Sequence, residues 1–328
     1  MSVETPTRQL LGRPRLRLGD RVFRGVTGAA AVFIIAVLAA TAVFLVVQAA
    51  PAMSRYGFFS FLSSDRWAPS EAASNPNASP YGILQFVYGT VVTSAIGMLI
   101  AVPASIAIAL YVTDVAPRRA RRPLSWLVDL LAAIPSVVYG FWGIFALIPA
   151  IKPVGKFLTE TLGSIPVIGS FFAGPFFGVS YFTAGIILAI MVLPIVTAIC
   201  REVFATAPRG EKEAALAVGA TRWEMLRIAV LPRSRSGIVG AAILGFGRAV
   251  GETIAVTMVI GNNVLNITTS IFGQGATMPS VIANEFTEAT EPFHLDSLFV
   301  VGFWLLVLAL IVNVAGKTIV SRAGEHIA

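Results

Sequence analysis

The chain has 328 residues, of which 56% are hydrophobic and only 12% are charged. Soluble domains carry about twice this charged fraction, so the composition excludes an ordinary soluble protein and predicts an integral membrane protein. The formal net charge of +7 is then better explained by basic loops at a membrane than by nucleic-acid binding. One cysteine, Cys200, excludes an internal disulfide, and two histidines far apart in sequence do not suggest a metal site.

Six apolar segments are long enough to cross a bilayer as helices, because one crossing takes about 20 residues. Residues 25–54 form the first and are predicted as a retained helix, with a cleaved signal peptide as the alternative. Pro103 and Pro194 are expected to kink the second and fourth helices, and Pro149 to end the third. The later segments lie within residues 84–112, 124–150, 179–200, 238–261 and 297–316. The predicted fold class is therefore an all-α integral membrane protein with six transmembrane helices.

The distribution of lysine and arginine predicts the orientation of these helices. Of the 24 basic residues, only four fall in loops on the side opposite the N-terminus: Arg55, Arg66, Lys152 and Lys156. Cytoplasmic loops carry the excess of basic residues, so both termini are predicted to be cytoplasmic. The chain then divides into a basic cytoplasmic segment (residues 1–24), a transmembrane domain (residues 25–316) and a cytoplasmic tail (residues 317–328).

The longest predicted cytoplasmic loop, residues 201–237, carries defined signals for a first short helix. Pro208 opens a helix that runs through Glu213, Ala214 and Ala215. Gly219 is expected just past its end, where glycine commonly adopts the left-handed conformation. The loop is therefore predicted to fold rather than to connect two spans as a flexible tether.

A second short helix is predicted in the same loop. Thr221 and Glu224 form a capping box at its start, and Pro232, which follows Leu231, stops it. Trp223 and an aliphatic face on this helix have no partner within the loop. A solvated helical linker is one interpretation. A surface that docks on another protein is favoured, because a linker seldom needs such capping or such an apolar face.

The order of Glu213-Ala214-Ala215, Gly219 and Leu231-Pro232 resembles the EAA loop of ABC importer permeases. In that family the loop supplies the coupling helix that docks on a cytoplasmic ATPase. The aliphatic residue usual two places before the leucine is replaced here by Ala229. The chain contains no Walker A pattern. The resemblance therefore implies that ATP and Mg bind to a separate ATPase subunit, and that this chain holds no cofactor and is a transporter subunit rather than an enzyme.

Two further segments indicate which branch of the ABC importer permeases the chain resembles. IPSVVYGFWGIFALIP (residues 134–149) and GFGRAVGETIAVTMVIGNN (residues 245–263) resemble PstC-type permeases of phosphate-specific ABC importers, and the resemblance covers residues 85–315. The paired PstA-type permeases share the RAxGET block, so the surrounding residues favour PstC. The resemblance implies a type I (MetI-like) permease fold in the bacterial inner membrane. It also implies a PstA-like permease, a PstB-like ATPase dimer and a PstS-like phosphate-binding protein as partners, beside membrane lipids and without nucleic acid.

Arg248 and Glu252 are charged residues in the middle of the fifth predicted span. An ionised side chain at mid-bilayer costs roughly 2.5–3.5 kcal/mol, and residues four apart on a helix can pair. One interpretation is that the pair neutralises itself and serves only helix packing. The functional interpretation is that Arg248 faces the translocation pathway and contacts an oxyanion through two N–H groups, while Glu252 holds it in the empty state. Thr253 and Thr257 are expected to add hydroxyl donors nearby.

Other functions compete with a phosphate permease. An ABC permease for another oxyanion, such as sulfate or molybdate, would use the same arginine. An ion-gradient-driven phosphate transporter would usually show inverted repeats or more embedded carboxylates. A membrane phosphatase or transferase would need a base such as histidine beside the arginine, and no histidine lies in a predicted span. A structural subunit whose partner supplies the whole pathway is a further alternative.

Three remaining charged groups carry weaker predictions. Asp129 is expected at the membrane interface, at the inner end of the third span, with a contact to the ATPase as the alternative. Asp114, with the arginine cluster at residues 118–122, is predicted to form a lipid-headgroup patch. The acidic run from Glu285 to Asp296 is predicted to be a solvated outer loop, or alternatively a contact for a binding protein.

Overall fold

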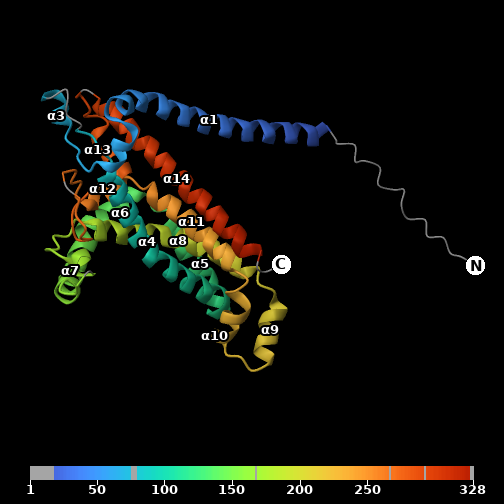
Figure 1. Ribbon diagram of the computed structural model, residues 1–328. Helices are drawn as coiled ribbons and strands as arrows, with labels where there is room; N and C mark the ends of the chain where they lie inside the picture. The colour runs from blue at the N-terminus through green and yellow to red at the C-terminus, as the bar shows by residue number, and fades with distance from the viewer. Residues whose placement is uncertain (1–17, 75–79, 167, 266, 292, 326–328) are drawn as a thin grey trace, which may run out of the picture.

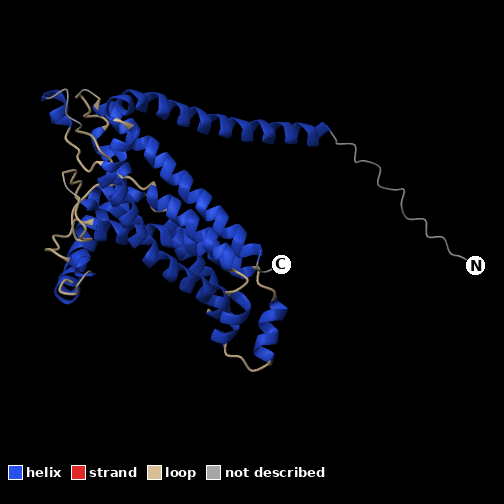
Figure 2. Cartoon of the chain, in the orientation of Figure 1, coloured by secondary structure: helices blue, strands red, loops and turns tan. Residues whose placement is uncertain are grey.

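The computed structural model describes residues 18–74, 80–166, 168–265, 267–291 and 293–325 (Figure 1). Parts of the predicted N-terminal segment and C-terminal tail, residues 1–17 and 326–328, lie outside the described residues. Within the described ranges the regular structure is helical, apart from two isolated bridges, Trp67–Tyr81 and Gly261–Gly275 (Figure 2). The prediction of an all-α membrane protein is confirmed.

The described residues contain five helical segments that are long and apolar enough to cross a membrane, or six if one bent pair is counted as a span. They are α1 (Leu18–Tyr56), α4 with its π-helical end η1 (Leu84–Leu110, Tyr111–Val115), α6 to α7 (Ser136–Leu162), α8 (Tyr181–Ala205) and α14 (His294–Glu325). The bent pair consists of α11 (Arg235–Val250) and α12 (Ile254–Ile260).

Helices α4 and α8 form the centre of the bundle. They approach closely because glycines stand at their contact: a Cβ on Gly185 would lie 2.4 Å from a methyl group of Ile96, and one on Gly97 would lie 3.0 Å from Leu188. Small residues let membrane helices approach in this way without a hydrophobic driving force. Helix α11 packs against both α8 and α14, and α1 packs against α14.

Short helices occupy the two ends of the bundle (Figure 1). At one end lie α2 (Phe58–Ser63), α3 (Pro69–Ser74) and α13 (Met278–Glu285), and α2 and α13 contribute to a buried cluster that includes Trp67 and Tyr81. Helices α9 (Arg209–Ala217) and α10 (Arg222–Met225) lie at the opposite end. This separation matches the prediction that the loop of residues 201–237 and the loop of residues 51–81 face opposite sides of the membrane.

Helix α1 leaves the bundle and extends away from it over most of its length (Figure 1). Large apolar side chains from Val22 to Val47 are exposed in the isolated chain, whereas Ala49 and Ala52 near its C-terminal end are buried. Its central stretch, residues 25–54, carries no charge, and an apolar helix surface of this kind is stable only where lipid or another membrane subunit covers it.

The prediction of one continuous third span over residues 124–150 is wrong. The segment divides into an amphipathic helix, α5 (Arg118–Ala132), then α6 (Ser136–Trp142), a π-helical turn, η2 (Gly143–Leu147), and α7 (Ile148–Leu162). Pro135 explains the break, because it cannot donate to the preceding turn and disfavours helical geometry in the residue before it. Pro149 does not end the span, because it lies in the first turn of α7, where a missing N–H is tolerated.

Candidate functional site

The fifth span is broken at the charged motif. The prediction of one helix through residues 238–261 is wrong, because α11 ends at Val250, α12 begins at Ile254, and the two axes differ by 64°. Gly251 caps α11, and Glu252 lies in the break, where its carboxylate accepts a hydrogen bond from the Ala255 N–H at 3.4 Å. A carboxylate is favourable at a helix start, where unpaired N–H groups and the helix dipole present positive charge.

The expected ion pair between Arg248 and Glu252 is not formed in this structure. In the described part of the chain neither side chain is salt-bridged, because the bend removes the helical spacing that would bring residues four apart together. Arg248 lies exposed in the last turn of α11, where the helix dipole favours a cation. The structure therefore presents a guanidinium without a counter-charge, next to a helix break.

The glycines of α11 and its C-cap fall into two groups: one permits helix packing, and the others leave a face of the helix open. A Cβ on Gly245 would lie 2.7 Å from Val196 and 2.8 Å from Val192, so this glycine permits the close approach of α8. A Cβ on Gly247 would meet no neighbouring atom within 4 Å, and one on Gly251 would meet only the backbone of its own helix. The face that carries Arg248 is therefore open in the isolated chain.

Both threonines of the motif already donate their hydroxyl protons to the backbone. The Thr257 hydroxyl donates to the Thr253 carbonyl at 2.8 Å, and the Thr253 hydroxyl donates to the Gly251 carbonyl at 3.3 Å. The expectation that these residues supply hydroxyl donors is wrong for this conformation. Their oxygens remain able to accept hydrogen bonds.

The break in the fifth span lies beside the break in the third. Helix α12 packs on α6, where a Cβ on Gly140 would lie 2.5 Å from the sulfur of Met258 and 3.3 Å from the Cα of Ala255. Next to Gly140, the Tyr139 hydroxyl donates to the Leu131 carbonyl at 2.7 Å and so bridges the interruption between α5 and α6. Irregular backbone is tolerated at membrane depth only where protein or a water-filled cavity surrounds it.

The loop of residues 201–237 folds as predicted. Helix α9 ends before Gly219, which adopts a left-handed conformation with φ of 91°. Thr221 then caps α10: its N–H and hydroxyl donate to the Glu224 carboxylate at 2.7 and 2.8 Å, and its hydroxyl accepts from the Glu224 N–H at 3.3 Å. These bonds to the charged form hold the pKa of Glu224 below its ordinary value. A π-helical turn, η4 (Leu226–Val230), follows and ends before Pro232.

One face of this loop is anchored in the bundle and the other is free. Met225, Leu226 and Val230 are buried in the same cluster as α8 residues, with Ala215 and Leu231 packed against it. Trp223 and Val218 are 61% and 86% exposed. Glu213, Ala214 and Gly219 also lie exposed, and Pro232 is half-buried.

Two ion pairs lie at the base of the loop. Lys212 on α9 contacts Asp114 at the end of α4 at 2.6 Å, with side chains only 16% and 11% exposed, and Arg233 contacts Glu211 at 2.5 Å. The prediction that Asp114 joins a lipid-headgroup patch is therefore wrong, because its carboxylate is paired with Lys212 of the loop. No local sequence signal could have shown this, since Asp114 and Lys212 are 98 residues apart.

Two other charged groups are also placed by the structure. Asp129 on α5 pairs with Arg201 on α8 at 2.9 Å, so it joins two helices rather than only facing the membrane interface. Glu285 in the acidic run is not solvated: it accepts from Trp67 Nε1 at 2.8 Å and contacts His294 at 2.8 Å. The rest of the acidic run stays untested as a contact for a binding protein.

Comparison with known proteins identifies the family. Residues 101–324 match the family described as binding-protein-dependent transport system inner membrane component. The chain belongs to this family. It is therefore a multi-pass inner-membrane permease subunit of a transporter and not an enzyme, and such permeases work with an ATPase and a substrate-binding protein.

Individual relatives extend over nearly the whole permease. It is 42% identical over 309 residues to the phosphate transport system permease protein PstC of Mesorhizobium japonicum, covering 94% of this chain and 92% of that one. It is 41% identical over 304 residues to the protein of the same name from Xylella fastidiosa, covering 92% and 91%. Its fold is similar to a solved structure of the inward-facing MetNI methionine ABC transporter, with a TM-score of 0.50 at 20% identity over 74% of this chain and 94% of that one.

Proposed function

We propose that this permease is the PstC-type subunit of an ATP-driven phosphate importer, with Arg248 as the group that meets the anion. The observation that carries the proposal is the exposed arginine without a counter-charge at the break of a membrane helix. The similarity to permeases named for phosphate transport supports the choice of substrate.

The uncompensated charge on Arg248 needs a partner from outside the chain. A bare cation within a membrane costs several kcal/mol, so an anion from outside the chain would stabilise this position. Guanidinium suits a phosphate, because it is always charged and its fixed N–H groups contact two oxygens at once. The open face around Gly247 and Gly251 leaves room for the anion or for a facing helix of a second permease subunit.

The acceptors at the start of α12, on the other side of the break from Arg248, would favour phosphate over sulfate or molybdate if they line the same pathway. At neutral pH phosphate keeps at least one P–OH proton, whereas sulfate has none to donate. The Glu252 carboxylate and the Thr253 and Thr257 oxygens, whose hydroxyl protons are donated to the backbone, offer acceptors and no free proton. In a pathway shared with Arg248, these acceptors would take a hydrogen bond from phosphate and would repel a fully ionised oxyanion.

The loop between α8 and α11 is proposed to dock on the ATPase. Its exposed face, with Trp223 and Val218, would insert into a groove of a PstB-like ATPase dimer, which would bind ATP and Mg. Glu213, Ala214, Ala215, Gly219, Leu231 and Pro232 would shape the loop. Because the Lys212–Asp114 pair ties α9 to α4, movement of the loop would be transmitted to the centre of the bundle.

The remaining assignments complete the proposal. A PstA-like permease would share the pathway, and a PstS-like protein would deliver phosphate from outside. Residues 1–24 and 317–328 would be cytoplasmic, on either side of the transmembrane domain of residues 25–316.

The test is uptake of radiolabelled phosphate at low micromolar supply, in cells that lack the permease and in the same cells with it restored. We expect phosphate uptake to be lost in cells that lack the permease and to return when the permease is restored. Excess sulfate should not inhibit the restored uptake. Inhibition by sulfate would favour the oxyanion alternative, and uptake that survives ATP depletion would favour an ion-driven transporter.

A further inference from the structure

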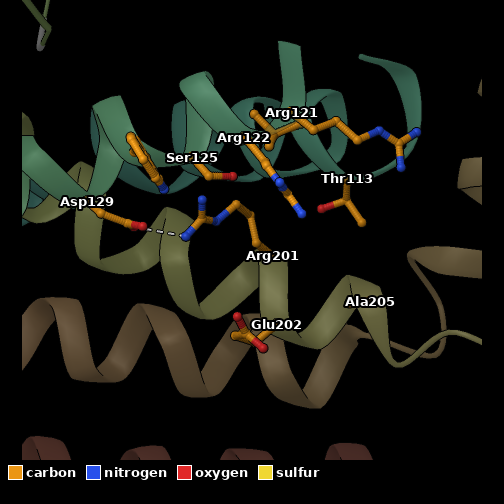
Figure 3. A pocket seen from close by; sticks show the side chains of 10 residues that line it. Thr113, Arg121, Arg122, Ser125, Asp129, Arg201, Glu202 and Ala205 are labelled. Atoms are coloured by element: carbon orange, nitrogen blue, oxygen red, sulfur yellow. Dashed lines mark hydrogen bonds and ion pairs between the residues drawn. The ribbon is translucent and has the colours of Figure 1, made fainter. Parts of the chain in front are cut away.

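A cavity separate from the helix break lies at the end of the bundle that carries the coupling loop. It has a volume of about 460 Å³, within the range of roughly 300–1,000 Å³ typical of small-ligand sites. Its walls come from the end of α4, from α5 and from the end of α8 (Figure 3). The lining residues that matter here are Thr113, Arg121, Arg122, Ser125, Asp129 and Arg201.

The arginines of this cavity carry more positive charge than its walls neutralise. Arg121 donates to two neutral backbone carbonyls, Ala116 at 2.9 Å and Asp114 at 3.4 Å, so its charge is not cancelled. Arg122 is exposed and has no acidic partner among the described residues, and its side chain points into the cavity (Figure 3). An anion between these side chains would complete the electrostatics of the site.

Arg201 adds a third guanidinium from the facing helix. One terminal nitrogen pairs with Asp129 at 2.9 Å, while its buried Nε has no hydrogen-bond acceptor. A single carboxylate therefore leaves this arginine incompletely satisfied. The other acidic lining residue, Glu202, is directed away from Arg122 toward the neighbouring helix (Figure 3).

The cavity opens beside a helix built for the membrane surface. Helix α5 is amphipathic, and its Trp126, which also lines the cavity, is 76% exposed beside exposed Leu127 and Leu130. Exposed tryptophan on an amphipathic basic helix is typical of the headgroup level of a bilayer. The Ser125 and Thr113 hydroxyls add hydrogen-bonding groups of the kind that phosphate oxygens accept.

We propose that this cavity binds a phosphate-bearing anion, held between Arg122 of α5 and Arg201 of α8, with Arg121 adding positive charge at the edge of the cavity. Two sources share this chemistry: the headgroup of an anionic phospholipid in the adjoining leaflet, and free inorganic phosphate. The site is distinct from the break at Arg248 and does not depend on which substrate the permease transports.

The test uses the purified transporter complex in non-ionic detergent and follows the fluorescence of Trp126, obtained as the difference between the unmodified complex and its Trp126→Phe variant. The probes are short-chain phosphatidylglycerol, short-chain phosphatidylcholine and inorganic phosphate. Arg122→Gln removes a cavity arginine. Arg119→Gln is the matched control, since it removes the same charge from the same helix but lies outside the lining. Both side chains are exposed, so neither variant is expected to unfold.

We expect a saturable change with phosphatidylglycerol or with inorganic phosphate, weakened roughly tenfold by Arg122→Gln, as for one lost charge-assisted hydrogen bond, and unchanged by Arg119→Gln. A response to inorganic phosphate identifies the free anion as a ligand, and a response to phosphatidylglycerol alone identifies the lipid. The proposal is overturned if neither probe gives a response, if phosphatidylcholine binds as well as phosphatidylglycerol, if both glutamine variants weaken binding equally, or if neither does.

Discussion

The loop of residues 201–237 and the broken fifth span differ in how their charged side chains are paired. At the base of the loop, Lys212 and Arg233 each contact a carboxylate of the same chain. In the fifth span, Arg248 is without a carboxylate partner in the described part of the chain, and Glu252 is used instead at the start of α12. Charges paired within the chain hold its own elements together, whereas the unpaired charge is the one that we propose to meet an anion from outside.

The strongest challenge to this comparison is removal of the unpaired charge. Arg248→Leu is expected to reduce phosphate uptake by at least about 100-fold, because the anion loses its only proposed cationic contact and both hydrogen bonds to it. Arg248→Lys should recover part of the rate, because an ammonium keeps the charge but cannot contact two oxygens in a fixed plane. Radiolabelled uptake and co-purification with the ATPase measure activity and assembly separately. Normal uptake by an assembled Arg248→Leu transporter would show that the arginine serves the structure alone.

The next largest effect is expected on the exposed face of the loop, which carries Trp223. Trp223→Ala is expected to weaken association with the ATPase subunit roughly 30-fold, the size of a tryptophan hot spot of about 2 kcal/mol. Since Trp223 is 61% exposed, the thermal stability of the isolated permease should not change. Binding of purified ATPase to the permease in nanodiscs measures the effect, and Trp142→Ala, which changes an exposed tryptophan on α6 away from the loop, is the control. Equal losses in the two variants would mean that Trp223 is not at the interface.

How much of this was predictable from the sequence depends on the range of the interaction. The glycine turn and the Thr221–Glu224 capping box were correct, because each is set by residues within a few positions of one another. The helix breaks before Ser136 and after Val250 were missed, because continuous apolar composition hides an interruption. Pro135 and Gly251 were the available signals. The Lys212–Asp114 pair was out of reach, since it depends on how α4 and α9 pack.

A smaller effect tests whether the paired charges are structural. Asp114→Asn is expected to destabilise the permease by about 1–3 kcal/mol, because Lys212 would keep its charge in a mostly buried position without a counter-charge. Lys212→Met combined with Asp114→Asn should recover part of the loss, since it removes the stranded charge as well. Thermal unfolding of the four members of this double-mutant cycle gives the coupling. Additive losses would mean that the pair does not fix the loop. Glu211→Gln, which breaks a much more exposed pair, should have little effect.

The capping box offers the smallest effect, visible only in the pH dependence of the loop. The Glu224 carboxylate accepts hydrogen bonds from the Thr221 N–H and hydroxyl, so its pKa in the folded loop lies below its ordinary value of 4.5. The folded loop therefore binds fewer protons than the unfolded loop. The stabilisation is complete above the ordinary pKa and is lost as the pH falls through the lowered, folded pKa. The protection factors of the backbone amides of α10, which compare their exchange with the intrinsic rate at each pH, should fall over this acidic range. Glu224→Gln should flatten that dependence while the amides of α8 stay unchanged, because the cap acts locally. Identical profiles for Glu224→Gln and the unmodified loop would show that α10 is held by Met225 and Leu226 packing against the bundle, and that the cap sets only where the helix begins.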